Sequence, residues 1–175
     1  MKVCILGAGE KKQIMDIPSG AEVVRVDYRK LPETDIVLNL QIQPQPDSYH
    51  PDVHWGLPAE AYHVVIAEHI AEHIWDRIAF LAECRRILQP GGLLILEVPS
   101  WKHESAHANL EHRSTWSRAI FGDTYVMPLL KFRLESTKFR IGLFWRSFGY
   151  VADFWGRMLD RLGLATAYRF YLRKL

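Results

Sequence analysis

The stretch His63–Pro99, HVVIAEHIAEHIWDRIAFLAECRRILQPGGLLILEVP, decides the fold of this chain. It opens with an apolar run of strand length, Val64–Ala67, and closes with a second one, Leu93–Val98. Between them, Ile and Leu recur at helical spacing, at positions 74, 78, 81 and 88. Asp76 can cap this helix at its start, and Pro90-Gly91-Gly92 ends it. Two strands that are apolar throughout, joined by a helix, predict a βαβ unit of a buried parallel sheet.

The same stretch resembles class I S-adenosyl-L-methionine (SAM)-dependent methyltransferases. In the small type-11-like group of that family, an EH pair after the fourth strand is followed by a helix that ends in R-x-L-x-P-G-G. Here these are Glu72-His73 and Arg86–Gly92. The resemblance implies an α/β fold, a doubly wound, mostly parallel, seven-stranded Rossmann-like sheet. It also implies SAM as the cofactor and methyl transfer as the reaction.

Composition and charge limit the classes of protein. A chain of 175 residues with 49% hydrophobic residues predicts a single domain, 1–175, that buries a core. Residues 1–100 carry 9 Lys+Arg and 14 Asp+Glu, whereas residues 101–175 carry 13 and 6. A solvated basic face is enough to explain this asymmetry, so we expect no nucleic acid partner. Two cysteines in no framework, no signal-peptide pattern and no apolar run near ~20 residues predict a cytoplasmic protein without a membrane span.

The N-terminal segment predicts a nucleoside site. Val3–Leu6 reads as a first strand and runs into the turn Gly7-Ala8-Gly9, where glycine lets the backbone approach a ligand. A second strand, Val23–Val26, ends at Asp27, whose carboxylate can accept hydrogen bonds from ribose hydroxyls. Dinucleotide-binding proteins share this geometry, but their third glycine is replaced here by Lys12, which favours SAM over NAD. A tight turn without any ligand is the third interpretation.

A third strand, Asp35–Leu40, follows after a link so short that a hairpin would also be possible. The resemblance keeps this strand parallel and implies that its end faces the adenine. Pro18 and Gly20 interrupt the segment after the first strand, so we expect reduced helices near the N-terminus. Glu68 and His69 follow the fourth strand, where open α/β sheets bind ligands. The predicted cofactor-binding residues are Gly7, Ala8, Gly9, Asp27, Tyr28, Asn39, Leu40, Glu68 and His69.

A rival motif lies in the turn after the fourth strand. The residues His69–His73 match H-x-x-E-H, a zinc protease pattern. Such a site needs a third protein ligand and a water, and the sequence does not identify that ligand. We therefore expect no metal site.

Two histidines are the candidate catalytic bases. His73 belongs to the EH pair, although it could simply cap the next helix or bond a backbone carbonyl. His112 ends Asn109–His112, which resembles the N/T-x-x-H that the family carries in its substrate loop. An ordinary surface loop is the alternative for this segment.

The last third predicts structure rather than chemistry. An alternating segment at 130–135, an amphipathic helix at 151–162 and an alternating segment at 168–173 resemble the antiparallel edge strands of the family and the helix between them. The acceptor implied by the resemblance is a small molecule or carbohydrate-like. The alternative is a methyltransferase-like protein that has lost catalysis and acts in binding or assembly. If the first strands lack helices, one sheet face needs cover, from the aromatic segment Phe144–Trp155 or from a second copy in a homodimer.

Overall fold

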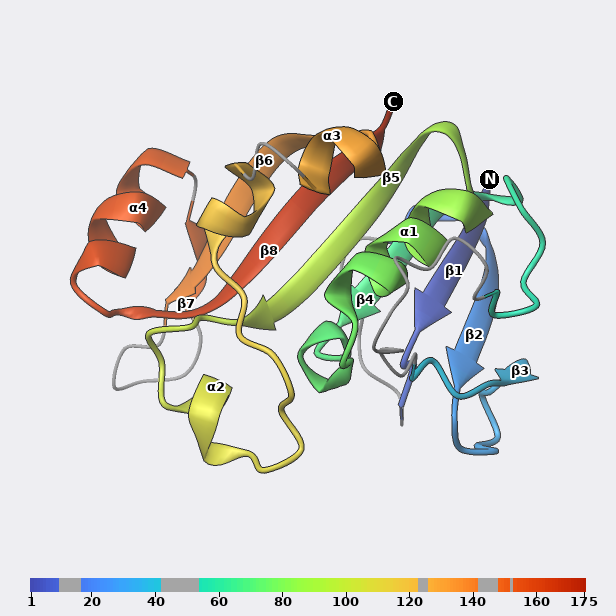
Figure 1. Cartoon of the computed structure of the whole chain (residues 1–175), viewed down its shortest axis with the longest axis horizontal. Helices are drawn as coiled ribbons and strands as arrows, with labels where there is room; N and C mark the ends of the chain where they lie inside the picture. The colour runs from blue at the N-terminus through green and yellow to red at the C-terminus, as the bar shows by residue number, and fades with distance from the viewer. Residues whose placement is uncertain (10–16, 42–53, 123–125, 142–147, 152) are drawn as a thin grey trace.

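The computed structural model describes residues 1–9, 17–41, 54–122, 126–141, 148–151 and 153–175 (Figure 1). In this part of the chain, eight strands form one sheet in the order β3-β2-β1-β4-β5-β8-β6-β7. The strands are β1 (Lys2–Leu6), β2 (Glu22–Asp27), β3 (Ile36–Val37), β4 (Tyr62–Glu68), β5 (Leu88–Pro99), β6 (Phe132–Ile141), β7 (Phe148–Val151) and β8 (Ala165–Lys174). The helices are η1 (Ala71–His73), α1 (Arg77–Ile87), α2 (Ser105–Ala108), η2 (Arg118–Gly122), α3 (Val126–Leu130) and α4 (Asp153–Arg161).

The first five strands of the sheet pair in parallel, as predicted. The third strand is much shorter than expected, only Ile36–Val37, but it is parallel to β2 with Val26 opposite Ile36. The link between them holds its shape through local hydrogen bonds: Arg25 N donates to Asp35 Oδ2 at 2.8 Å, and Asp35 N donates to the Arg25 carbonyl at 2.9 Å. This short link is sufficient because only two residues of β3 pair with β2.

The other strands are antiparallel and complete the predicted edge of the sheet. β8 lies between β5 and β6, with Glu97 opposite Arg169 and Leu134 opposite Leu172. One strand more than the predicted seven is present, because β7 pairs with the end of β6. The doubly wound methyltransferase-like order is therefore confirmed, with an added edge hairpin.

Three helices, α1, α3 and α4, cover one face of the sheet (Figure 1). Asp76 caps α1 as expected, accepting hydrogen bonds from Ile78 N at 3.0 Å and Ala79 N at 2.9 Å. The helix buries Phe80, Leu81, Cys84 and Ile87 against the sheet. Burial of each large apolar side chain contributes roughly 1.5–3 kcal/mol, so this face holds the main core.

The opposite face is apolar under β1 and β4 and becomes charged toward β8. Val3, Ile5 and Ile66 are buried there, with Ile17 and Ala21 packed against them. The described residues contain no α-helix before α1, but part of the segment after β1 lies outside them, so the expected reduction of N-terminal helices stays a prediction. The apolar part is nevertheless buried within one chain, so it is not a face that needs a second copy to cover it. Much of the aromatic segment 144–155 lies outside the described residues.

No helix among the described residues is long and apolar enough to cross a membrane. Both cysteines are buried as free thiols, and burial raises the pKa of Cys4 to about 12. Neither cysteine is therefore a candidate nucleophile.

Candidate functional site

A pocket of about 670 Å³ opens where the carboxyl ends of β1, β2, β3 and β4 meet. This is within the range of sites that bind small molecules or cofactors. The segments after those strands supply most of its lining, and the loop before Trp116 supplies the rest. Its lining residues are Gly7, Gly9, Asp27, Tyr28, Arg29, Leu38, Asn39, Leu40, Gln41, His69, Ile70, His73, Ile74, Glu111 and Arg113.

The glycine turn after β1 forms one wall. Gly7 and Gly9 have φ angles of 65° and 55°, a conformation that side chains disfavour. A Cβ on Gly7 would lie 2.9 Å from the Ile70 side chain, so only glycine allows this close packing. Ala8 donates from its backbone N–H to the Val26 carbonyl at 3.1 Å and is buried outside the pocket lining. Ala8 thus anchors the turn rather than facing the predicted ligand.

Asp27, at the end of β2, forms the second wall of the pocket. Its Oδ2 accepts a hydrogen bond from Gly9 N at 2.9 Å, and its Oδ1 accepts one from Arg29 N at 2.9 Å. Burial raises the pKa of this carboxyl, but these hydrogen bonds and the Arg29 guanidinium outweigh it and hold the pKa below its usual value. The ionised carboxylate can accept about four hydrogen bonds in all. Arg29 Nε also lies 3.3 Å from Oδ1, so among the residues that the structure describes one acceptor position, on Oδ2, is left for a ligand hydroxyl.

The segment after β3 forms the third wall. Leu38 N donates to the Asp27 carbonyl at 2.8 Å, which brings Asn39 and Leu40 beside the end of β2. Tyr28 is exposed and lines the same cavity. Leu38 and the buried Leu40 form an apolar surface that suits a flat ring. These predicted residues therefore meet at one site.

Beyond β4, the two predicted residues separate. His69 lines the pocket, with its Nδ1 3.3 Å from Glu72 Oε1 and its Nε2 3.4 Å from Glu97 Oε1. Burial lowers its pKa, but the two carboxylates outweigh burial and raise the pKa to about 9. Glu68 instead turns away from the lining, and its Oε1 pairs with Arg169 Nη2 at 3.1 Å.

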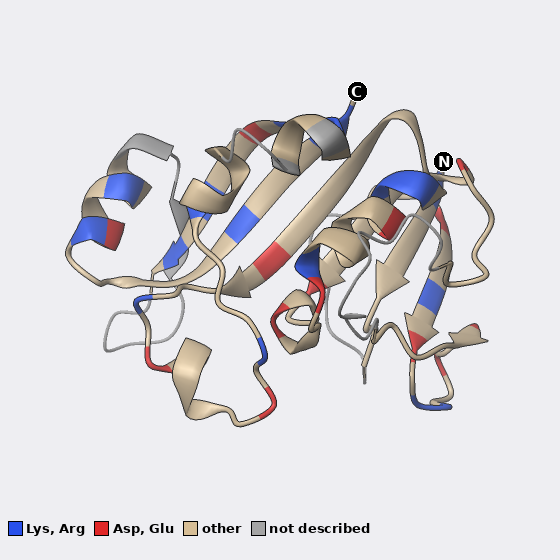
Figure 2. Ribbon diagram, viewed as in Figure 1, with Lys and Arg blue, Asp and Glu red and all other residues tan. Residues whose placement is uncertain are grey.

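Arg169 and Glu97 are residues that sequence reasoning missed. Arg169 on β8 lies opposite Glu97 on β5, and their side chains form an ion pair. Figure 2 shows an acidic segment on β5 and basic segments on the neighbouring β8. Glu97 falls near the end of a segment that the sequence predicts as an apolar strand. A single acidic residue in such a strand was the signal that could have indicated a buried partner. Together with Glu68 and His69 they form a charged cluster, in which Arg169 and Glu97 are buried and His69 reaches the pocket lining.

The two candidate bases lie next to each other. The rings of His73 and His112 pack edge to face with centroids 4.8 Å apart. His73 lines the pocket, and His112 stands behind it with Nε2 4.0 Å from Glu72 Oε1. The sequence proposed each histidine separately, and the fold brings them to one place.

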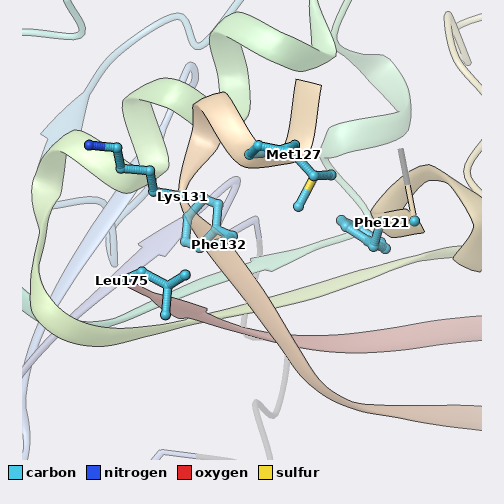
Figure 3. Close-up of a pocket in the computed structure, with 7 residues that line it drawn as sticks. Phe121, Met127, Lys131, Phe132 and Leu175 are labelled. Carbon is cyan, nitrogen blue, oxygen red and sulfur yellow. The ribbon is translucent and has the colours of Figure 1, made fainter. Parts of the chain in front are cut away.

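A second pocket, of about 390 Å³, lies near the C-terminus (Figure 3). Among the described residues its lining is mostly apolar, from Phe121, Met127 and Phe132, with Lys131 as the one ionisable side chain among them. This pocket offers no pair of groups for acid–base chemistry, so we place the functional site at the first.

Comparison with known proteins identifies the family of this chain. The family described as "Methyltransferase domain" matches residues 6–96. A ubiquinone biosynthesis O-methyltransferase from Bradyrhizobium sp. is 32% identical over 114 residues, which are 59% of this chain and 44% of that protein. The chain thus spans less than half the length of the curated relatives it matches.

Solved structures share the fold at low identity. A SAM-dependent methyltransferase from Archaeoglobus fulgidus superposes with a TM-score of 0.61 at 14% identity, over 99% of this chain and 86% of that one. The [4+2]-cyclase SpnF gives a TM-score of 0.60 at 11% identity, over 99% and 74%. At this identity the likeness establishes the fold alone.

Proposed function

This chain belongs to the methyltransferase domain family, and on that premise we propose that it binds SAM in the 670 Å³ pocket and transfers a methyl group to a small-molecule acceptor. The observation that carries the proposal is the convergence of three walls on one cavity. The Gly7–Gly9 turn, Asp27 and the Leu38–Leu40 segment are far apart in sequence, yet all contribute to its lining.

The residues fit such a cofactor chemically. An ionised carboxylate with a free acceptor site suits a ribose hydroxyl, and the leucines suit an adenine ring. SAM supplies a methyl group already activated on a sulfonium. The chain's own part is then to hold the acceptor in line with that methyl group and to exclude water, which can lower the barrier by several kcal/mol.

The acceptor side is the region of His73 and His112. If the acceptor is a hydroxyl, it must lose a proton, and one of these imidazoles is placed to receive it. A small-molecule hydroxyl is supported by the ubiquinone biosynthesis O-methyltransferase relative, whose name states that it methylates oxygen. A carbohydrate-like acceptor is the alternative. Release of S-adenosylhomocysteine with a panel of phenols and a panel of sugars would separate the two.

Calorimetric titration with SAM, S-adenosylhomocysteine and NAD tests the cofactor. We expect binding of both SAM compounds at one equivalent and no binding of NAD. Tight binding of NAD alone, or of none of the three, would refute the proposal.

A second function is a methyltransferase-like protein without catalysis. It is favoured by the short β2–β3 link and by the lack of α-helices before α1 in the described residues. The SpnF structure also has this fold and is named for a different reaction. SAM binding without methyl transfer to any acceptor of either panel would support this function.

A homodimer stays a prediction. The apolar residues under β1 and β4 are already buried and do not need a second copy to cover them. Trp155, Met158 and Leu162, however, form an exposed apolar stripe along and just beyond α4. Light scattering on dilute protein tests it, since a monomer has a mass of 20.3 kDa.

A further inference from the structure

Three potential metal ligands converge beside the pocket. One ligand atom from each of Glu72, His73 and His112 lies within 4.8 Å of the others. Glu72 and His73 come from η1, and His112 comes from the loop after α2. The Glu72 carbonyl accepts hydrogen bonds from Arg113 N at 2.7 Å and from Ser114 N at 3.1 Å, which holds that loop against η1.

Both imidazoles are oriented by backbone carbonyls. His73 Nδ1 lies 3.2 Å from the Glu111 carbonyl, and His112 Nδ1 lies 3.3 Å from the Ala106 carbonyl. A carbonyl can only accept, so each Nδ1 carries the proton and donates it. In a neutral imidazole with this tautomer, Nε2 carries the lone pair, which is the arrangement of a histidine that binds a metal through Nε2.

Glu72 provides an independent observation. Its side chain is buried, with the residue 2% exposed, and its Oε2 has no hydrogen-bond partner among the described residues. A buried polar atom without a partner is unfavourable by about 1–3 kcal/mol, and by more when it is charged. A cation bound at Oε2 would remove this penalty.

We propose that Glu72, His73 and His112 form a binding site for a divalent transition metal, and with the metal bound neither imidazole acts as the proton acceptor considered above. Two imidazoles and one carboxylate suit Zn²⁺, Mn²⁺, Fe²⁺ or Co²⁺ better than Mg²⁺ or Ca²⁺, which prefer oxygen ligands. Ligand atoms around a tetrahedral zinc are about 3.4 Å apart, given metal–nitrogen distances of about 2.1 Å. The three ligand atoms lie within 4.8 Å of one another, so they would have to move closer together to reach that geometry.

Three protein ligands leave a coordination position open. His73 also lines the pocket, so that position lies beside it. The sequence favoured a metal-free protein because H-x-x-E-H lacked its third ligand. The fold supplies one in His112, while His69, the first residue of that motif, pairs with Glu72 and Glu97 instead.

The test is metal binding by the purified full chain, independent of SAM and of activity. Protein stripped with a chelator is titrated with Zn²⁺ in competition with a chromophoric chelator, and with Co²⁺ followed by its visible absorption. We expect one equivalent of either metal. Glu72→Gln and His112→Asn should each weaken affinity by at least about 10–100-fold, the loss seen when only an outer partner of a ligand is removed.

His103→Asn is the matched control, because His103 lies on the other side of α2 from His112, between β5 and α2, and its Nδ1 contacts Ser105 Oγ at 2.7 Å rather than the cluster. It should bind metal as the wild type does. If wild type binds less than a tenth of an equivalent, or if the variants at 72 and 112 bind as tightly as His103→Asn, the site is refuted. Circular dichroism checks that each variant is folded. If only one of the two ligand variants folds, that variant is enough for the test. SAM binding measured on the same samples separates this outcome from failure of the proposed function.

Discussion

Arg169 on β8 stands directly opposite Glu97 on β5, with its Nε 2.6 Å from Glu97 Oε2. Both side chains are at most 5% exposed. Burial of two charges is tolerated here because each neutralises the other and Glu68 and His69 add further partners. The pair ties the antiparallel edge of the sheet to the floor of the pocket.

Arg169→Met should therefore destabilise the protein by about 3–5 kcal/mol, because it leaves Glu97 buried without its main partner. Urea unfolding measures this change. Arg173→Met is the control, since Arg173 lies on the same strand and pairs with Glu135 at the surface, 2.9 Å from Nε to Oε1. Such an exposed pair contributes about 0–1 kcal/mol. Equal losses in the two variants would contradict a special role for the buried pair.

Gly7→Ala should weaken both stability and SAM binding. The new Cβ would combine a left-handed backbone, about 1–2 kcal/mol, with a contact of 2.9 Å to Ile70. Gly20→Ala is a close control, because Gly20 has a φ of 77° but no atom within 4 Å of its Cβ position. We expect Gly20→Ala to show only the backbone strain and to keep its SAM affinity in calorimetry. A Gly7→Ala variant no worse than Gly20→Ala would remove the close-packing argument.

Asp27→Asn should reduce SAM affinity by about 10–150-fold, the equivalent of one charge-assisted hydrogen bond of about 1.5–3 kcal/mol. The amide nitrogen also replaces one of the two carboxylate oxygens, so either Gly9 N or Arg29 N, both donors, loses its acceptor. Asp35→Asn serves as the control, because Asp35 also accepts a backbone hydrogen bond, from Arg25 N, but lies outside the pocket. Unchanged affinity in Asp27→Asn would show that the carboxylate does not contact the ribose.

Stability should fall in acid through Glu83. Burial raises the pKa of this carboxyl, but hydrogen bonds from Arg86, Trp55 N and His54 outweigh burial and lower it. A lowered folded-state pKa means that the stabilisation is complete above the unfolded value of about 4.3 and is lost as the pH falls through the folded value. Urea unfolding between pH 7 and pH 3 should therefore show a steeper loss for wild type than for Glu83→Gln. Glu104→Gln, at an exposed position, should keep the wild-type slope.

The sequence determined the βαβ unit from β4 to β5, the cap at Asp76 and the glycine turn after β1. These features depend on interactions within a few residues, so apolar periodicity and capping residues reveal them. The family resemblance supplied the parallel pairing of β3, which the short link alone left open. The edge strand β7 was missed because its last residue, Val151, also fits the apolar stripe of the helix that follows.

Only the tertiary structure decided which side chains meet. The sequence separates Glu97 from Arg169 by 72 positions and the Glu111 carbonyl from His73 by 38. The first pair exists because β8 inserts antiparallel beside β5 in one register, and a shift by one residue would turn Arg169 to the other face. The second exists because two backbone N–H groups of the 113–114 segment find the Glu72 carbonyl. Neither contact can be predicted from local sequence patterns, because both depend on how distant segments pack against each other.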